Sequence, residues 1–210
     1  MGVIESTDGG KSWHERSTGL GENREVVELT SADRELRHLY AAVLSRVKPT
    51  PLPGGLYESL DSGEHWRRIE TPLENVTRVI AAHGRLYICG GVKARGSRWR
   101  NDGGVYVSED NGRSWNRLLG APLVSQLAVS PVNPRRLYCT VEPDTAMHMP
   151  SAGVYRSDDG GCVWRRVNRG LGISSMFTCM KYNPGRPEEL WLGTYGSGYY
   201  RLTENKETDR

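Results

Sequence analysis

Hydrophobic and polar residues alternate over short stretches along the whole chain. Residues 115–118 (Trp-Asn-Arg-Leu) are an example; a Gly-x-Tyr strand at 104–106 and β-branched or aromatic stretches at 76–81 and 85–89 precede them. Alternation with a period of two is typical of β-strands, because successive side chains point to opposite faces of a sheet. No segment shows a sustained helical period. The pattern therefore predicts an all-β protein with four strands in each repeated unit.

One eight-residue pattern, Ser-x-Asp-x-Gly-x-x-Trp, occurs four times in the sequence. Its aspartates stand at positions 8, 61, 110 and 159, so the spacings are 53, 49 and 49 residues. A fixed period near 50 residues indicates a repeat architecture. The four copies consist of Ser6, Asp8, Gly10 and Trp13; Ser59, Asp61, Gly63 and Trp66; Ser108, Asp110, Gly112 and Trp115; and Ser157, Asp159, Gly161 and Trp164.

The chemistry of this pattern predicts a reinforced turn between two strands. The aspartate accepts hydrogen bonds from backbone N–H groups further along the turn, and the serine hydroxyl closes the turn locally. The glycine supplies a backbone conformation that other residues oppose. The tryptophan packs its apolar ring under the turn and leaves its N–H available to a carbonyl.

The pattern is the Asp-box, and the chain resembles the BNR repeat superfamily over residues 2–203. This superfamily includes sialidases, sortilin-type receptors, xyloglucan-cleaving glycoside hydrolases and a photosystem II assembly factor. The resemblance implies a β-propeller of four-stranded blades, with the boxes as structural turns on the side away from the substrate. It does not choose among the functions of these proteins.

The box spacing predicts a single propeller domain of about 4.5–5 blades. We expect a partial blade at residues 1–18 and an incomplete blade at 169–203, followed by a charged tail at 204–210. Three whole blades are expected between them, at 19–70, 71–119 and 120–168. Two arrangements fit. The chain forms either an open, partial propeller or a five-bladed ring in which residues 12–15 complete the last blade; we favour the first, because residues 2–6 would compete with residues 198–202 in the ring.

The loops between the second and third strands of each blade are long and gather on one face. The loop at 90–104 is strongly basic. Arginines bind carboxylates or phosphates, and an exposed tryptophan stacks on a sugar, so this loop predicts a protein or anionic glycan partner. The alternative is a solvated loop whose tryptophan packs on a neighbouring blade. The residues concerned are Lys93, Arg95, Arg98, Trp99 and Arg100.

Alignment of the innermost strands places Glu28, Arg78, Gln126 and Thr178 in one column. Such a column points one way and is expected to line the central channel. We consider it a second candidate ligand site. The alternative is the ordinary polar lining of a water-filled channel.

Evidence for catalysis is weak in the sequence. Sialidases carry an Arg-Ile-Pro motif, but residues 68–70 read Arg-Ile-Glu, and the family's arginine triad and tyrosine–glutamate pair cannot be placed. Another kind of glycoside hydrolase needs two carboxylates about 5–10 Å apart. Asp102, Glu142 and Asp144 lie on the predicted loop face and could meet there, but the favoured explanation is that they are solvated loop acids that shape turns. The five histidines have no carboxylate at a spacing that predicts a dyad.

Composition and motifs bear on the remaining classes of function and on the compartment of the protein. The formal charge of +3 over 210 residues does not indicate nucleic acid. No motif for a cofactor or a metal ion occurs, no apolar run reaches membrane length, and no signal peptide is evident, so cytoplasm is the default compartment unless the parent protein is secreted. The four cysteines are expected to be buried free thiols on strands: Cys89, Cys139, Cys162 and Cys179.

The sequence leaves two main hypotheses for function. The first is a non-catalytic binding or scaffold propeller whose loop face engages a protein or glycan; a related third hypothesis is an assembly factor whose basic surface contacts a protein partner. The alternative is a glycoside hydrolase of the sialidase-like or xyloglucanase-like kind, with catalytic residues outside this chain.

Overall fold

The computed structural model describes residues 2–46, 51–93, 99–142, 153–171 and 177–204, and the side chains of residues 92–102 are not among the described ones. In these ranges seventeen β-strands form five antiparallel sheets. The described residues contain no helix that is long and apolar enough to cross a membrane. The prediction of an all-β chain is confirmed.

Three sheets have four strands each, and we call them the first, second and third full sheets. A two-stranded N-terminal hairpin precedes them and a three-stranded C-terminal sheet follows. The hairpin contains β1 (Ile4–Glu5) and β2 (His14–Glu15), and the first full sheet contains β3 (Val26–Ser31), β4 (Leu39–Val43), β5 (Gly55–Ser59) and β6 (Arg67–Ile69). The second full sheet contains β7 (Asn75–Ala82), β8 (Arg85–Lys93), β9 (Trp99–Ser108) and β10 (Asn116–Gly120). The third full sheet contains β11 (Val124–Val129), β12 (Leu137–Val141), β13 (Gly153–Ser157) and β14 (Arg165–Arg166), and the C-terminal sheet contains β15 (Phe177–Asn183), β16 (Arg186–Thr194) and β17 (Tyr199–Thr203).

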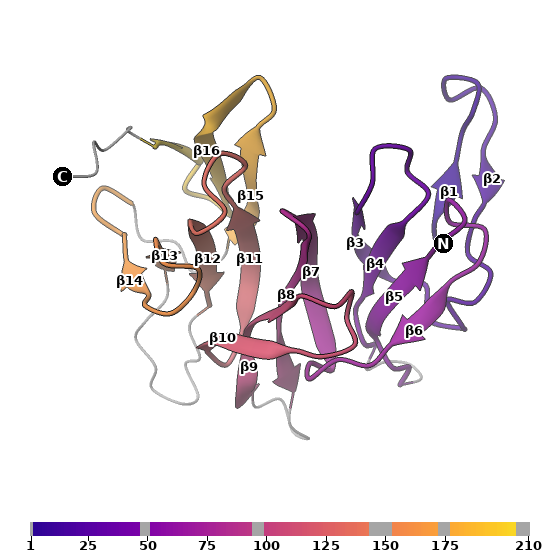
Figure 1. Ribbon diagram of the computed structural model, residues 1–210, viewed down its shortest axis with the longest axis horizontal. Coiled ribbons are helices and arrows are strands. Elements are labelled where there is room, and N and C mark those ends of the chain that lie inside the picture. Colours follow the sequence, from indigo (N-terminus) through magenta and orange to yellow (C-terminus); the bar gives the residue numbers. More distant parts are fainter. Residues whose placement is uncertain (1, 47–50, 94–98, 143–152, 172–176, 205–210) are drawn as a thin grey trace.

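The sheets follow one another around an open arc (Figure 1). Their first strands β3, β7, β11 and β15 are neighbours in this order and line the inside of the arc. The N-terminal hairpin stands at one end and the C-terminal sheet at the other (Figure 1). This radial series of four-stranded sheets confirms the predicted β-propeller fold. Because β2 pairs with β1 and not with β17, the structure has the open arrangement and not the five-bladed ring.

The core lies between the sheets. In β4, Leu39, Ala41 and Val43 pack toward the N-terminal hairpin, whereas Tyr40 and Ala42 pack toward the second full sheet. All five side chains are buried. A strand with neighbours on both faces reads as a continuous apolar run, because its alternating side chains have no solvent-exposed face.

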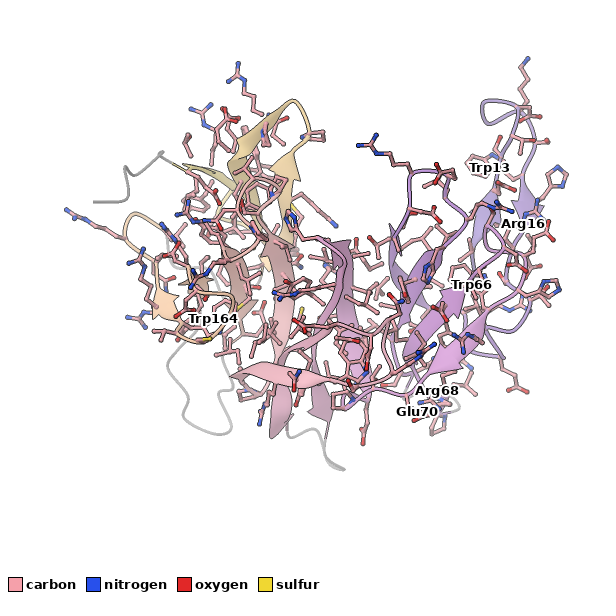
Figure 2. All side chains as sticks on the ribbon, in the orientation of Figure 1. Trp13, Arg16, Trp66, Arg68, Glu70 and Trp164 are labelled. Atoms are coloured by element: carbon pink, nitrogen blue, oxygen red, sulfur yellow. The ribbon has the colours of Figure 1, made fainter. Side chains whose placement is uncertain are left out.

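The Asp-boxes are the turns between the third and fourth strands, and their tryptophans connect neighbouring sheets. In the first full sheet, Ser59 Oγ and the His65 N–H both donate to Asp61 Oδ1, over 2.8 and 2.9 Å. Figure 2 shows Trp66 facing the N-terminal hairpin that carries Arg16. In the three full sheets the indole N–H donates to a backbone carbonyl at the end of the preceding sheet: Trp66 to Arg16 over 2.8 Å, Trp115 to Glu70 over 3.0 Å and Trp164 to Leu118 over 3.1 Å.

The sequence analysis assigned Glu204 to a charged tail, and the structure places this residue against the third full sheet. Its side chain is buried and accepts hydrogen bonds from Ser130 Oγ over 3.1 Å and from the Tyr182 hydroxyl. It also pairs with Arg136 of the third full sheet, over 3.3 Å. Glu204 therefore joins the end of β17 to the preceding sheet, while the rest of the predicted tail, residues 205–210, lies outside the described residues.

The expectation of four buried thiols holds for two cysteines. Cys89 and Cys139 are buried on β8 and β12, and burial raises the pKa of Cys89 to about 12. Cys179 on β15 is half-buried. Cys162 is exposed, because it lies in the turn of the fourth Asp-box and not on a strand.

Candidate functional site

A β-bulge recurs at the same place in all four inner strands and organises the polar residues of the arc. The strand register shifts between Val26 and Glu28 in β3, and corresponding shifts occur in β7, β11 and β15. A bulge inserts one residue and redirects the side chain that follows it. The residues directly after the four bulges are Glu28, Arg78, Gln126 and Cys179.

The strand register changes the last member of the predicted inner column from Thr178 to Cys179. Thr178 is the extra residue of the bulge in β15, and it is exposed. Cys179 takes the position that aligns with Gln126. The residues directly before the four bulges are all apolar, and an alignment on them would have placed Cys179 in the column: Val26, Val76, Val124 and Phe177.

Glu28, Arg78 and Gln126 are brought together as a continuous polar row. Arg78 Nε lies 3.3 Å from Glu28 Oε2 and 3.0 Å from Gln126 Oε1. Gln126 Nε2 donates to the carbonyl of Phe177 over 3.2 Å, which continues the row to β15. Gln126 is buried, and the side chains of Arg78 and Glu28 are only 18% and 14% exposed. We call these three residues the inner row.

Lys181 extends the inner row across the mouth of the arc. Its Nζ lies 2.6 Å from Glu28 Oε1, although the two residues belong to the first and last inner strands. Glu28 is thus held between two cations, Arg78 and Lys181. The sequence analysis missed Lys181, because it stands two residues beyond the aligned column and no spacing rule connects β15 with β3.

Glu142 places a partly buried acid beside the inner row. It follows β12 directly, and its Oε1 accepts a hydrogen bond from Ser125 Oγ and another from the Phe177 N–H over 3.4 Å. Ser125 is the bulge residue next to Gln126. Burial raises the pKa of the Glu142 carboxyl, which favours the protonated form. Glu142 is therefore the described carboxyl group best suited to act as a general acid near the inner row.

The basic loop predicted at residues 90–104 is shorter in the structure. Trp99 and Arg100 lie on β9, opposite Lys93 and Val92 of β8, because the hairpin extends further than the sequence indicated. Their side chains are outside the described residues, as is that of Asp102. Arg95, Arg98 and Asp144 lie wholly outside the described residues, so the ligand role of this loop stays a prediction.

Two histidines do form close pairs with carboxylates, which the sequence analysis did not expect. His38 Nε2 lies 2.8 Å from Glu58 Oε1, and His65 Nδ1 lies 2.8 Å from Asp61 Oδ2. The spacing missed the first pair because His38 and Glu58 meet across two strands. Glu64 joins His65 and Asp61 in an exposed group of possible metal ligands, but Asp61 already serves the turn of its Asp-box.

Comparison with known proteins agrees with the repeat and the fold. The model of the BNR/Asp-box repeat family matches residues 4–15. The structure is similar to a GH74 xyloglucanase from Xanthomonas campestris, with a TM-score of 0.71 and 15% identity, covering 97% of this chain and 34% of that one. At this identity the likeness shows the fold.

Two curated proteins match nearly the whole chain. A xyloglucanase from a Paenibacillus species is 26% identical, over 94% of this chain and 18% of the relative. An oligoxyloglucan-reducing end-specific xyloglucanase from Emericella nidulans is 22% identical, over 92% of this chain and 31% of the relative. The chain therefore spans between about a fifth and a third of the curated relatives it matches. It is a β-propeller chain with BNR/Asp-box repeats, and these matches do not resolve a more specific family.

Proposed function

We propose that this chain is a glycan-binding part of a glycoside hydrolase propeller and that its glycan is xyloglucan. The observation that carries the proposal is the alignment of more than nine-tenths of the chain with two xyloglucanases. The similarity favours the glycoside hydrolase hypothesis over the non-catalytic scaffold. The inner row supplies the polar chemistry that such a ligand needs.

In this proposal the inner row binds sugar hydroxyl groups. A hydroxyl both donates and accepts hydrogen bonds, and the row presents carboxylate oxygens at Glu28 and N–H donors at Arg78, while the buried amide of Gln126 holds Arg78 in place. The existing contacts between these groups hold them in place before a ligand arrives, which reduces the entropy lost on binding. The bulges that direct the three side chains belong to rigid inner strands.

Glu142 is our candidate for acid chemistry at this site. Glycoside hydrolysis uses an acid and a second carboxylate about 5–10 Å from it. Glu142 has the raised pKa of an acid, whereas Glu28 is paired with Arg78 and Lys181. We therefore assign glycan binding and an acid to this chain and expect the second carboxylate to come from parts of the protein outside it.

Isothermal titration calorimetry with xyloglucan oligosaccharides tests the binding. We expect unbranched cello-oligosaccharides of equal length to bind more weakly. Arg78→Ala should weaken the affinity at least about tenfold, corresponding to the loss of a charged hydrogen-bond donor. The exposed Arg113, in the box of the second full sheet, provides the matched control, and Arg113→Ala should leave the affinity unchanged.

Two results would overturn the proposal. One is the absence of heat of binding with any xyloglucan oligosaccharide while circular dichroism shows a folded β protein. The other is equal affinity in Arg78→Ala and Arg113→Ala. Arg78→Lys, which keeps the positive charge, separates loss of binding from loss of folding.

A further inference from the structure

A polar cavity of about 260 Å³ lies between the first and second full sheets, beside the turn that joins β7 and β8. One water molecule needs roughly 10–15 Å³ of such space, so the cavity is large enough for a small organic molecule. Its lining includes no carboxylate among the described residues and no member of the inner row. The polar side chains of the lining are His38, Tyr40, His83, Arg85 and Asn111.

The corresponding place between the third full sheet and the C-terminal sheet is filled by side chains. There the Glu204 carboxylate accepts hydrogen bonds from Ser130 Oγ, over 3.1 Å, and from the Tyr182 hydroxyl. It also pairs with Arg136, over 3.3 Å. A carboxylate and a phenol ring therefore occupy this junction, and side chains from both sheets hold the carboxylate.

The strand register identifies the residues that take these places at the junction of the first and second full sheets. They are Ala32 for Ser130, Ala81 for Tyr182 and His38 for Arg136. All three line the cavity. Asp110 takes the position of Glu204, but its carboxylate accepts hydrogen bonds from the N–H and the hydroxyl of Ser114 in its own box. The cavity is therefore the space that a carboxylate and a phenol ring fill at the other junction.

Arg85 supplies positive charge to the cavity. Its Nη2 lies 2.7 Å from Glu109 Oε1, and the two side chains are 43% and 62% exposed. Exposed ion pairs contribute little stability, so the guanidinium can exchange Glu109 for the carboxylate of a ligand and bind it with two N–H groups. The buried acid Glu58 does not line the cavity, and its charge is balanced by Arg67 and His38.

The two histidines are held in the wall of the cavity by protein acceptors. His38 Nε2 lies 2.8 Å from Glu58 Oε1, and His83 Nε2 lies 2.8 Å from the Ser130 carbonyl oxygen. His83 has a φ of 51°, because it opens a two-residue turn with Gly84 between β7 and β8. A neutral imidazole that donates through Nε2 accepts through Nδ1, so each ring keeps an acceptor for the hydroxyl group of a ligand.

Tyr40 adds a hydroxyl group to this wall. Its hydroxyl, like that of the corresponding Tyr138, has no hydrogen-bond partner among the described residues. Burial, and then the charge of the nearby Glu58, raise the pKa of Tyr40, so the hydroxyl stays protonated at neutral pH. A ligand that reaches this group gains a donor without breaking an existing hydrogen bond.

We propose that this cavity binds a small sugar acid, a ring that carries several hydroxyl groups and one carboxylate. The carboxylate pairs with Arg85 and takes the place that Glu204 fills at the other junction. The hydroxyl groups bind the imidazoles of His38 and His83, the Tyr40 hydroxyl and the Asn111 amide. This site is separate from the proposed xyloglucan site, because Arg78 and the rest of the inner row do not line the cavity.

NMR titration of the whole chain tests this inference with D-glucuronate as the probe. The matched ligand is D-glucose, which has the same ring without the carboxylate, and we expect D-glucuronate to bind at least tenfold more tightly. The amide signals of His83 and Gly84 should report the binding. Arg85→Ala should weaken the affinity for D-glucuronate at least about tenfold, whereas Arg113→Ala, at an exposed turn, should leave it unchanged.

A second variant tests the cavity itself. Ala81→Tyr introduces the residue that fills the other junction and should abolish the binding of D-glucuronate, with circular dichroism as the check on folding. The inference is overturned if D-glucuronate does not bind the wild type, or if it binds no more tightly than D-glucose. It is also overturned if folded Ala81→Tyr or Arg85→Ala binds D-glucuronate like the wild type. Arg85 is exposed, so Arg85→Ala decides the matter if Ala81→Tyr does not fold.

The two binding sites can be judged separately. Arg85→Ala leaves the inner row intact and should bind xyloglucan oligosaccharides like the wild type. Failure of xyloglucan binding in the wild type would overturn the proposed function alone, and failure of D-glucuronate binding would overturn this inference alone.

Discussion

Trp66 and Trp13 occupy the same position of the same motif and have different surroundings. Trp66 is 5% exposed and donates its indole N–H to Arg16 of the preceding hairpin, whereas Trp13 is 59% exposed. The turns themselves are alike, since Asp61 and Asp8 each accept a serine hydroxyl and a backbone N–H within 2.9 Å. The box thus forms its turn from local contacts, and a neighbouring sheet is needed to bury its tryptophan.

This comparison separates local from tertiary stabilisation in a repeat protein. Each repeat buries its apolar surface only against its neighbours, so terminal repeats are expected to be incomplete. In the middle of the arc a box tryptophan packs against the core between neighbouring sheets, as Trp115 and Trp164 do. At the two ends of the described arc, Trp13 and Trp191 are exposed instead.

The largest expected effect is the loss of Trp66. Trp66→Ala should lower the free energy of unfolding by about 3–5 kcal/mol, because it removes a buried aromatic ring and leaves a cavity. Trp13→Ala should lower it by less than about 1 kcal/mol, since its ring is mostly exposed. Urea unfolding of dilute protein measures both, and equal losses would contradict the comparison.

Loss of Arg78 is expected to have an intermediate effect. Arg78→Ala leaves the buried amide of Gln126 and the carboxylate of Glu28 without this donor, which should cost about 1–3 kcal/mol. Arg113→Ala, at an exposed turn, should be neutral within about 0.5 kcal/mol. Urea unfolding at pH 7 measures the stability of both variants. An Arg78→Ala variant as stable as the wild type would show that the inner row does not hold the inner strands together.

The Asp-box turns should weaken in acid. The His65 backbone N–H, the His65 ring and the Ser59 hydroxyl lower the pKa of Asp61 from 3.8 to about 2. A lowered pKa in the folded state stabilises the fold above the unfolded pKa, and this contribution is lost as pH falls from 3.8 to about 2. Asp61→Asn should therefore unfold more easily than the wild type at pH 7, with the difference vanishing near pH 2. A pH series of urea midpoints tests this, and a difference independent of pH would contradict it.

Glu142 should show the opposite pH dependence with a smaller effect. Burial raises its pKa above 4.5, so its protonated form stabilises the fold at low pH, and this contribution is lost as pH rises through the raised value. Glu142→Gln has no charge to bury and should gain stability relative to the wild type between pH 4.5 and 7. A pH series of urea midpoints for Glu142→Gln and the wild type measures this difference in stability. A relative stability that falls with rising pH would show that the charged carboxylate is the better accommodated form.

The sequence predicted the repeating units of this fold better than the contacts between them. The Asp-box spacing and the alternating pattern predicted the sheets, because turns and strand faces depend on nearby residues. The column of Glu28, Arg78 and Gln126 was also predicted, since corresponding repeats place these residues alike. Thr178 was misplaced by one residue, since alignment on the apolar residue before each bulge brings Cys179 level with Gln126.

Contacts between distant parts of the chain were not predictable from local patterns. Lys181 meets Glu28 across 153 positions, and Glu204, at the start of the predicted charged tail, is buried beside Arg136 and Tyr182. The exposure of Trp13 was likewise not predicted, because its motif is as complete as that of Trp66. Each of these features depends on which sheets stand next to each other.

Quenching of single-tryptophan variants by acrylamide tests the central claim most directly. One variant keeps only Trp13 and another only Trp66, with phenylalanine at the other tryptophan positions, and both are measured in dilute solution. The account predicts that the emission of Trp13 is quenched several-fold more strongly than that of Trp66. Equal quenching of the two would contradict it, because both Asp-box tryptophans would then have a neighbouring sheet.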